Sequence, residues 1–233
     1  MKKILKKAVL FAVALTASAT AFAQPAAGTF SLTPKVGLNV AGITGKNFDA
    51  SYTLSDQSKL TATADYKADF VGGVEVGYQV TSKFALSAGV LYSGQGFDRC
   101  SGIDGNYDGY SYSYEDDSKL TLGYINVPIL ANYYIFKGFA VKVGIQPGFL
   151  VSSKFKKEIN ASGIAQALNK NETRDVKDLC NKVDVAIPVG VSYEFGCGVV
   201  VDGRYNIGLT DVYKDISGKN SVFQLTVGYK FAL

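Results

Sequence analysis

The last thirteen residues of the chain, SVFQLTVGYKFAL, alternate strictly between apolar and polar side chains. Phe223, Leu225 and Val227 fall on one face, whereas Gln224 and Thr226 fall on the other. A period of two is typical of a β-strand with one face in an apolar environment. A strand of a transmembrane barrel needs this pattern, because it meets lipid on one face and a polar interior on the other. The segment therefore predicts a membrane-spanning strand.

Eight segments of the chain show the same alternation. They cover residues 30–40, 70–80, 84–95, 120–135, 139–153, 183–195, 199–209 and 221–233. Most reach the roughly 9 to 11 residues that a tilted strand needs to cross a bilayer. This pattern predicts an all-β fold, an eight-stranded antiparallel transmembrane up-and-down β-barrel.

The connections between these segments alternate between long and short. The segment after Val40 and residues 96–119, 154–181 and 210–220 are long, whereas residues 81–83, 136–138 and 196–198 are short. Short periplasmic turns and long extracellular loops are the plan of an outer-membrane barrel, with both termini in the periplasm. A soluble lipocalin-like barrel is the alternative, but it would turn its apolar face inward and has no reason to keep long loops on one rim.

The first 23 residues have the parts of a secretory signal peptide. Basic lysines are followed by an apolar stretch over residues 8–17 and by an Ala-Phe-Ala cleavage site at residues 21–23. A retained helical anchor is the weaker interpretation, because the apolar run is about half of the ~20 residues required. We therefore expect a cleaved signal peptide over residues 1–23 and one barrel domain over residues 24–233.

The predicted mature chain is formally neutral. Residues 1–23 hold four of the 24 Lys and Arg residues and none of the 20 acidic residues. A neutral chain offers no electrostatic argument for nucleic-acid binding, and we exclude that class of function.

Five stretches of the chain resemble a known family. They read TPKVGLNVAGITG, LTLGYINVPILANYY, GIQPGFLVSSK, GRYNIGLTDV and VFQLTVGYKF. Together they are similar to the PorT-like outer-membrane β-barrel domain family and to OmpX/OmpA-like eight-stranded barrels. The likeness covers residues 29–233 and its motifs are structural. It implies an outer-membrane location in a Gram-negative bacterium and a role in transport or protein secretion.

The end of the sequence also resembles the signal that barrel assembly machinery reads. The residues that carry this likeness are Thr226, Gly228, Phe231 and Leu233. Leu233 stands where most such proteins have an aromatic residue. The resemblance implies that the assembly machinery is a partner of the chain.

Charged residues recur on the face that the alternation turns inward. They are Lys35, Lys142, Arg204 and Lys230 with Glu75, Asp184, Glu194 and Asp202. One interpretation makes them a substrate or proton path. We favour the other: an eight-stranded barrel is only wide enough for its own side chains, and charges buried there pair to offset desolvation.

The chain contains no histidine, the side chain best suited to proton transfer near neutral pH. The lack of histidine does not exclude a catalytic site built from Ser and Lys, from two Asp residues or from Cys. However, no local motif in the sequence positions such a site. We therefore expect that the protein is not an enzyme.

Residues 104–115, DGNYDGYSYSYE, match the EF-hand calcium-loop pattern. The candidate ligands are Asp104, Asn106, Asp108 and Glu115. Asp, Asn and Gly are also ordinary loop residues, and the predicted flanks are strands rather than helices, so we favour a loop without a cofactor. The tyrosines of the same segment are either an adhesive surface or part of a membrane-interface girdle.

Cys100 and Cys180 fall at the predicted extracellular rim, and Cys197 falls in a periplasmic turn. Exported proteins form disulfides. The sequence therefore predicts a Cys100–Cys180 disulfide and a free Cys197.

These observations favour a non-enzymatic outer-membrane surface protein with an envelope-structural or interaction role through its extracellular loops. A component of a transport or secretion system is the alternative that the PorT-like resemblance implies, and a narrow pore is a weaker one. The expected partners are outer-membrane lipid, the assembly machinery and an extracellular or envelope protein. We expect a monomer.

Overall fold

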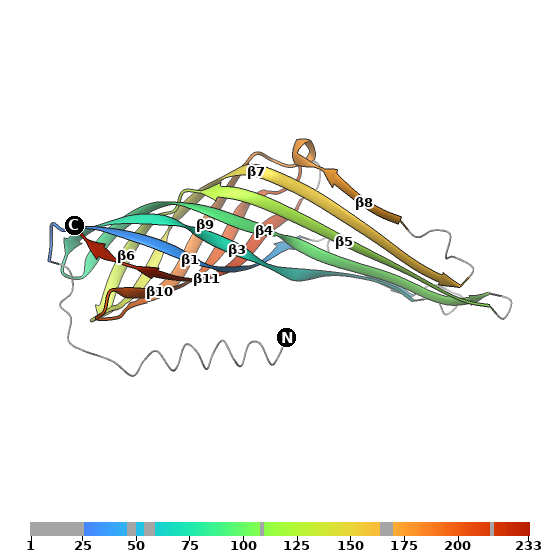
Figure 1. The fold of residues 1–233 in the computed structure, drawn as a ribbon, viewed down its shortest axis with the longest axis horizontal. Helices are drawn as coiled ribbons and strands as arrows, with labels where there is room; N and C mark the ends of the chain where they lie inside the picture. Colours follow the sequence, from blue (N-terminus) through green and yellow to red (C-terminus); the bar gives the residue numbers. More distant parts are fainter. Residues whose placement is uncertain (1–25, 46–49, 54–58, 108–109, 164–169, 215–216) are drawn as a thin grey trace.

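The chain builds a tube of antiparallel strands that is drawn out on one side into a tall sheet (Figure 1). The computed structural model describes residues 26–45, 50–53, 59–107, 110–163, 170–214 and 217–233. The strands are β1 (Phe30–Thr44), β2 (Ala50–Thr53), β3 (Lys59–Thr81), β4 (Phe84–Tyr107), β5 (Tyr110–Asn126), β6 (Ile129–Phe136), β7 (Phe139–Gly163), β8 (Lys170–Asp175), β9 (Val183–Glu194), β10 (Val199–Asp211), β11 (Lys219–Tyr229) and β12 (Phe231–Ala232). A 3-10 turn, η3 (Lys177–Leu179), precedes β9.

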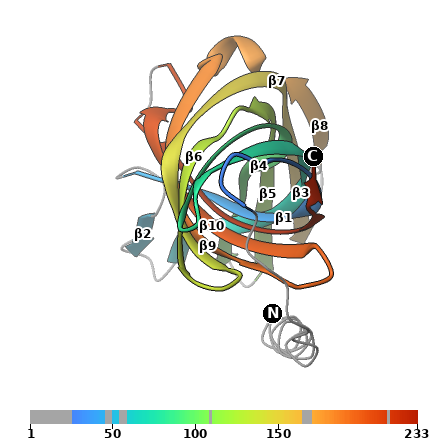
Figure 2. The same ribbon diagram turned by 90° about the vertical axis from the view of Figure 1, so that its left-hand side faces the viewer.

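Within the described residues, eight strand positions close into a ring. β1 pairs with β3 on one side and with β11 and β12 on the other. The remaining neighbours along the ring pair antiparallel, with β5 and β6 forming one position that is interrupted at residues 127–128. Figure 2 shows β1 between β3 and the C-terminal strands. The predicted eight-stranded up-and-down barrel is confirmed.

The alternation turns polar side chains inward and apolar ones outward. On β1, Lys35 and Asn39 are buried, whereas Val36 and Leu38 are 59% and 61% exposed. Exposed Val, Leu, Ile, Phe and Tyr side chains form a band on the outside of the ring strands. A soluble barrel would show the reverse pattern, so the lipocalin-like alternative is excluded. The structure instead has the surface of a transmembrane barrel.

The predicted short turns are confirmed, and the long connections lie at the opposite end, but most of their described residues form strands rather than loops. Residues 81–83, 136–138 and 196–198 contain the turns at one end of the ring, which also carries the C-terminus and is called here the terminal end. At the opposite end, called the hairpin end, β4 and β5 continue as paired strands through residues 96–107 and 110–119. β3 and β7 are extended in the same way. An antiparallel hairpin satisfies backbone hydrogen bonds that a loop would leave to water, and the Tyr residues of β4 and β5 favour strands.

Gly96 lies where β4 passes from the ring into the tall sheet. Its φ of +127° is a backbone conformation that L side chains rarely adopt. A Cβ atom there would also lie 2.1 Å from the Leu120 carbonyl oxygen. Close by, the β3–β4 register shifts between Tyr66 and Val71. The transition between ring and sheet therefore requires glycine at this position.

Among the described residues, no helix is long and apolar enough to span a bilayer.

Ring closure predicts heat-modifiable migration in dodecyl sulfate gels. The backbone hydrogen bonds of a closed ring leave no edge from which unfolding can spread, so the refolded protein should resist dodecyl sulfate until it is heated. Electrophoresis of boiled and unboiled samples is the measurement. The same apparent mass before and after boiling would contradict a stable closed barrel.

Candidate functional site

Five inward-facing charged residues meet in the interior of the barrel. Lys35 comes from β1, Glu75 from β3, Lys142 from β7, and Asp202 and Arg204 from β10. We call them the charged cluster. Because residues two apart on a strand share a face, Asp202 and Arg204 both point inward.

Glycine makes room for the largest member of the charged cluster. Arg204 lies opposite Gly190 on β9, and a Cβ atom on Gly190 would lie 3.0 Å from the Arg204 Cγ and 2.3 Å from a neighbouring carbonyl oxygen. Any larger residue at position 190 would therefore push the arginine out of place.

Arg204 holds both carboxylates of the charged cluster. Its Nε and Nη2 donate to the two oxygens of Asp202 at 2.7 and 2.8 Å, and Nη2 also donates to Glu75 at 2.6 Å. Lys35 donates to Glu75 at 2.7 Å and to Asp202 at 3.4 Å. Lys142 forms an ion pair with Asp202. These charge-assisted bonds offset the large cost of taking the groups out of water.

The other predicted members of the lumen network lie elsewhere. Lys230 and Glu194 form a separate ion pair of 2.8 Å nearer the terminal end, and Lys230 also donates to the Tyr134 hydroxyl at 3.3 Å. Asp184 lies farther toward the hairpin end and accepts a hydrogen bond from the Thr210 hydroxyl at 2.7 Å. The structure thus brings five of the eight residues together. The charged cluster itself holds three cations and two acids.

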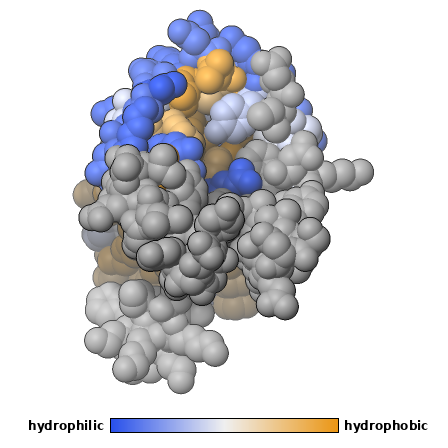
Figure 3. All heavy atoms as spheres, turned by 90° about the vertical axis from the view of Figure 1, so that its right-hand side faces the viewer, coloured by the Kyte–Doolittle hydropathy of each residue, from blue (hydrophilic) through white to orange (hydrophobic). Residues whose placement is uncertain are grey.

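Two further layers fill the lumen above the charged cluster. The order Lys35, Asn39, Ile43 along β1 marks the three levels. The middle level, the amide layer, consists of the buried residues Asn39, Gln95, Asn126, Gln146, Asn206 and Gln224. Nearest the hairpin end is the apolar cluster, formed by Ile43, Phe97, Leu120, Leu122, Tyr124, Leu150, Cys180 and Val212. Figure 3, viewed from the hairpin end, shows apolar surface recessed behind a hydrophilic rim.

Sequence reasoning did not find the apolar cluster. On β5 the inward positions 120, 122 and 124 are Leu, Leu and Tyr, whereas the outward positions 121 and 123 are Thr and Gly. Here the hydropathy pattern is the inverse of that on β1. This inversion is a signal that was readable in the sequence.

The tall sheet at the hairpin end extends the wall of the ring. β3, β4, β5 and β7 form its centre, and β2 and β8 pair with β3 and β7 at its sides. Its faces carry ion pairs such as Lys157–Asp116 at 2.8 Å and Lys119–Asp98 at 3.7 Å. The sheet is therefore a polar, water-facing structure.

The prediction of a Cys100–Cys180 disulfide is wrong, because Cys180 is a free thiol. Its side chain is fully buried in the apolar cluster, with its sulfur 3.7 Å from the Ser153 hydroxyl. Burial raises the pKa of the Cys180 thiol. Cys100 lies on β4 between Thr63 and Asp117, and its side chain is outside the described part of the structure. Cys197 is free and exposed, as predicted.

The calcium-loop pattern lies on the β4–β5 hairpin. Asp104 is paired with Ser113, and Glu115 with Gly102, in an extended ladder. Asp108 and the side chains of Asp104 and Asn106 lie outside the described residues. Among the described side chains, no group of three or more Cys, Asp or Glu could hold a metal ion. Calcium binding stays a prediction.

The residues of the predicted assembly signal lie on the closing strands. Thr226 faces the lumen and is buried, and Gly228 is paired with Lys35. Phe231 is paired with Leu32, and the Leu233 amide donates to the Phe30 carbonyl at 2.9 Å. These residues therefore help to close the ring, and their reading by the assembly machinery stays a prediction.

The sequence and the fold are similar to those of known proteins. Residues 22–214 match the family described as outer membrane protein beta-barrel domain. No curated protein sequence matches the chain.

Three solved structures illustrate the similarity. Ail, the attachment invasion locus protein of Yersinia pestis, is 15% identical over 88% of this chain and 99% of that chain, with a TM-score of 0.39. Neisserial surface protein A is 10% identical over 87% and 97% of the two chains, with a TM-score of 0.42. The outer membrane protease OmpT from Escherichia coli is 12% identical over 88% and 97%, with a TM-score of 0.36.

The charged cluster predicts unequal costs for removing its cations. Arg204→Met breaks three short hydrogen bonds to two buried carboxylates and should lower the free energy of unfolding by about 3 kcal/mol. Lys142→Met leaves two cations facing two carboxylates and should cost less than about 1 kcal/mol. Urea unfolding in detergent, followed by circular dichroism, measures both. Equal losses of unfolding free energy in the two variants would contradict the role of Arg204 as the residue that holds both carboxylates.

The free thiols predict a sharp difference in labelling. In a Cys100→Ser background, a bulky maleimide should modify Cys197 in the folded protein and Cys180 only after denaturation, because Cys180 is buried and its raised pKa lowers the thiolate fraction. Mass shifts with and without denaturant measure this. Rapid labelling of both cysteines in the folded state would show that the apolar cluster is open.

Proposed function

We infer that this chain, which belongs to the outer membrane protein beta-barrel domain family, is a non-enzymatic surface protein of the outer membrane that binds an extracellular or envelope partner through the sheet at its hairpin end. The tall sheet is the observation that carries this proposal. Beyond Gly96, β4 and β5 continue as paired strands with a rise of about 3.3 Å per residue. They extend far past the apolar band of the ring.

The sheet has the properties of a binding platform. Paired strands present a preorganised surface, so less conformational entropy is lost on binding than with a flexible loop. The β8 side carries Lys170, Glu172 and Arg174, which keep it soluble and discourage indiscriminate strand pairing. A charged edge of this kind favours selective contacts.

The filled lumen argues against the narrow-pore alternative. The charged cluster, the amide layer and the apolar cluster occupy successive levels of the interior. Side chains fill an eight-stranded ring, and an apolar level adds a barrier to ions. These features favour a role for the outside of the protein over passage through it.

The orientation of the barrel in the membrane follows from the difference between its two ends. We place the terminal end in the periplasm, because its turns are short, and the hairpin end outside the cell. The tall sheet then reaches beyond the lipid headgroups, where an external partner can meet it. A PorT-like secretion component is the alternative, and it would bind envelope subunits.

Shortening the sheet tests the proposal. Arg99 and Ser118 are direct partners on β4 and β5, so replacing residues 100–117 by an Asn-Gly turn should keep their register. The shortened protein should still show heat-modifiable migration. It should lose partners that a photo-crosslinker at Lys170 captures from intact cells in the full-length protein.

A matched control carries an insertion in the short turn at Ser82 and Lys83, at the opposite end. It should keep the crosslinked partners. Equal capture by the shortened protein would overturn the role of the sheet, and recovery of envelope secretion subunits would support the alternative.

A further inference from the structure

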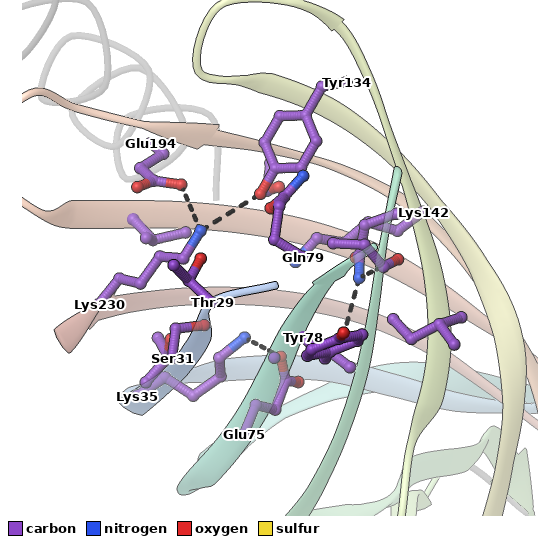
Figure 4. A pocket seen from close by; sticks show the side chains of 18 residues that line it. Thr29, Ser31, Lys35, Glu75, Tyr78, Gln79, Tyr134, Lys142, Glu194 and Lys230 are labelled. Atoms are coloured by element: carbon purple, nitrogen blue, oxygen red, sulfur yellow. Dashed lines mark hydrogen bonds and ion pairs between the residues drawn. The ribbon is translucent and has the colours of Figure 1, made fainter. Parts of the chain in front are cut away.

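The lumen has a small cavity at the terminal end, between the charged cluster and the Lys230–Glu194 pair. Its volume is about 60 Å³. Three lysines and two carboxylates line it, together with the hydroxyl groups of Ser31, Thr33 and Ser192; the charged residues are Lys35, Lys142, Lys230, Glu75 and Glu194. Figure 4 shows the side chains of this cavity, which we call the vestibule.

The charged cluster beside the vestibule carries a surplus positive charge. Among the described side chains it contains three cations, Lys35, Lys142 and Arg204, but only two carboxylates. All three cations converge on one oxygen of Asp202. The neighbouring Lys230–Glu194 pair is neutral and supplies no further negative charge.

Coulomb interactions are strong in such a buried setting, because few water molecules screen them. A surplus cation there is stabilised by an anion within contact distance. Of the two cluster cations that line the vestibule, Lys142 is the more exposed, at 10% against 2% for Lys35.

Hydroxyl groups add a second, independent feature. Ser31, Thr33 and Ser192 line the vestibule beside the two lysines. Each hydroxyl group can donate a hydrogen bond to an anion.

We propose that the vestibule binds a small monovalent oxyanion, such as dihydrogen phosphate or hydrogencarbonate. The negative charge of the ligand lies against Lys142 and Lys35. Its oxygens accept hydrogen bonds from Ser192 and the neighbouring hydroxyl groups. The volume has room for about four water molecules, which matches the four or five heavy atoms of these ions.

Titration of inorganic phosphate into the refolded barrel tests the site. The protein is held in dodecyl maltoside, which has no phosphate of its own, in slightly acidic buffer, where phosphate is mainly the dihydrogen ion. Calorimetry should show saturable binding of one ion per barrel. Chloride should compete only weakly, because a single atom cannot contact the lysines and the hydroxyl groups together.

Two variants locate the ion. Lys142→Gln removes the surplus charge and should weaken binding about tenfold or more, as expected for a charge-assisted hydrogen bond. Ser192→Ala removes one donor without changing charge and should weaken binding about threefold to tenfold. Lys137→Gln is the matched control, since it removes a lysine from an exposed turn at the same end, and its affinity should be unchanged.

A short-chain phosphatidylglycerol distinguishes a free ion from a lipid headgroup. Its phosphate is a diester that is too bulky for the vestibule, so it should not displace inorganic phosphate. Displacement by the lipid would overturn the assignment to a free oxyanion. Absence of saturable binding to the unaltered protein, or unchanged affinity in both vestibule variants, would overturn the site. These outcomes are independent of the partner that the tall sheet binds.

Discussion

The structure depends on the pairing of every backbone N–H and C=O group that faces lipid. Hydrocarbon offers no hydrogen bonds, so the wall of the barrel has to close on itself, and here β1 closes it by pairing with both β3 and β11. Closure fixes the rest of the architecture. Neighbouring strands run antiparallel, side chains alternate between lipid and lumen, and the interior is limited to what an eight-stranded ring can enclose.

The filling of that interior follows from a second cost, the desolvation of charge. Asp202 and Glu75 are both held by Arg204, and no carboxylate of the charged cluster is left with a single partner. Toward the hairpin end the lumen changes from ions to amides and then to apolar side chains. The chain thereby places the charged cluster nearer the terminal end and the apolar cluster nearer the hairpin end of a single tube.

The sequence predicted the ring but not the contacts inside it. Alternation at Lys35, Glu75, Lys142, Asp202 and Arg204 correctly placed these residues inward, because a period of two needs only local information. Which of them meet depends on the stagger between strands, so the sequence could not show that Lys230 pairs with Glu194 apart from the charged cluster and that Asp184 lies nearer the hairpin end. The tall sheet was mistaken for loops because Gly and Asp residues outweighed the alternation of their neighbours. Cys180 was misplaced because its position depends on how the segment before β9 folds into the mouth of the barrel.

The unequal height of the strands divides the molecule into two parts with different opening motions. Inside the ring, a hydrogen-bonded backbone amide can exchange its proton with solvent only when the closed wall opens as a whole. Beyond Gly96 the strands belong to an open sheet, with β2 and β8 at its sides, and such a sheet can fray strand by strand from its edges. Amide protons of the upper parts of β4 and β5 therefore exchange through local openings that leave the ring intact. The chain thus combines a wall of high kinetic stability with a surface that can rearrange.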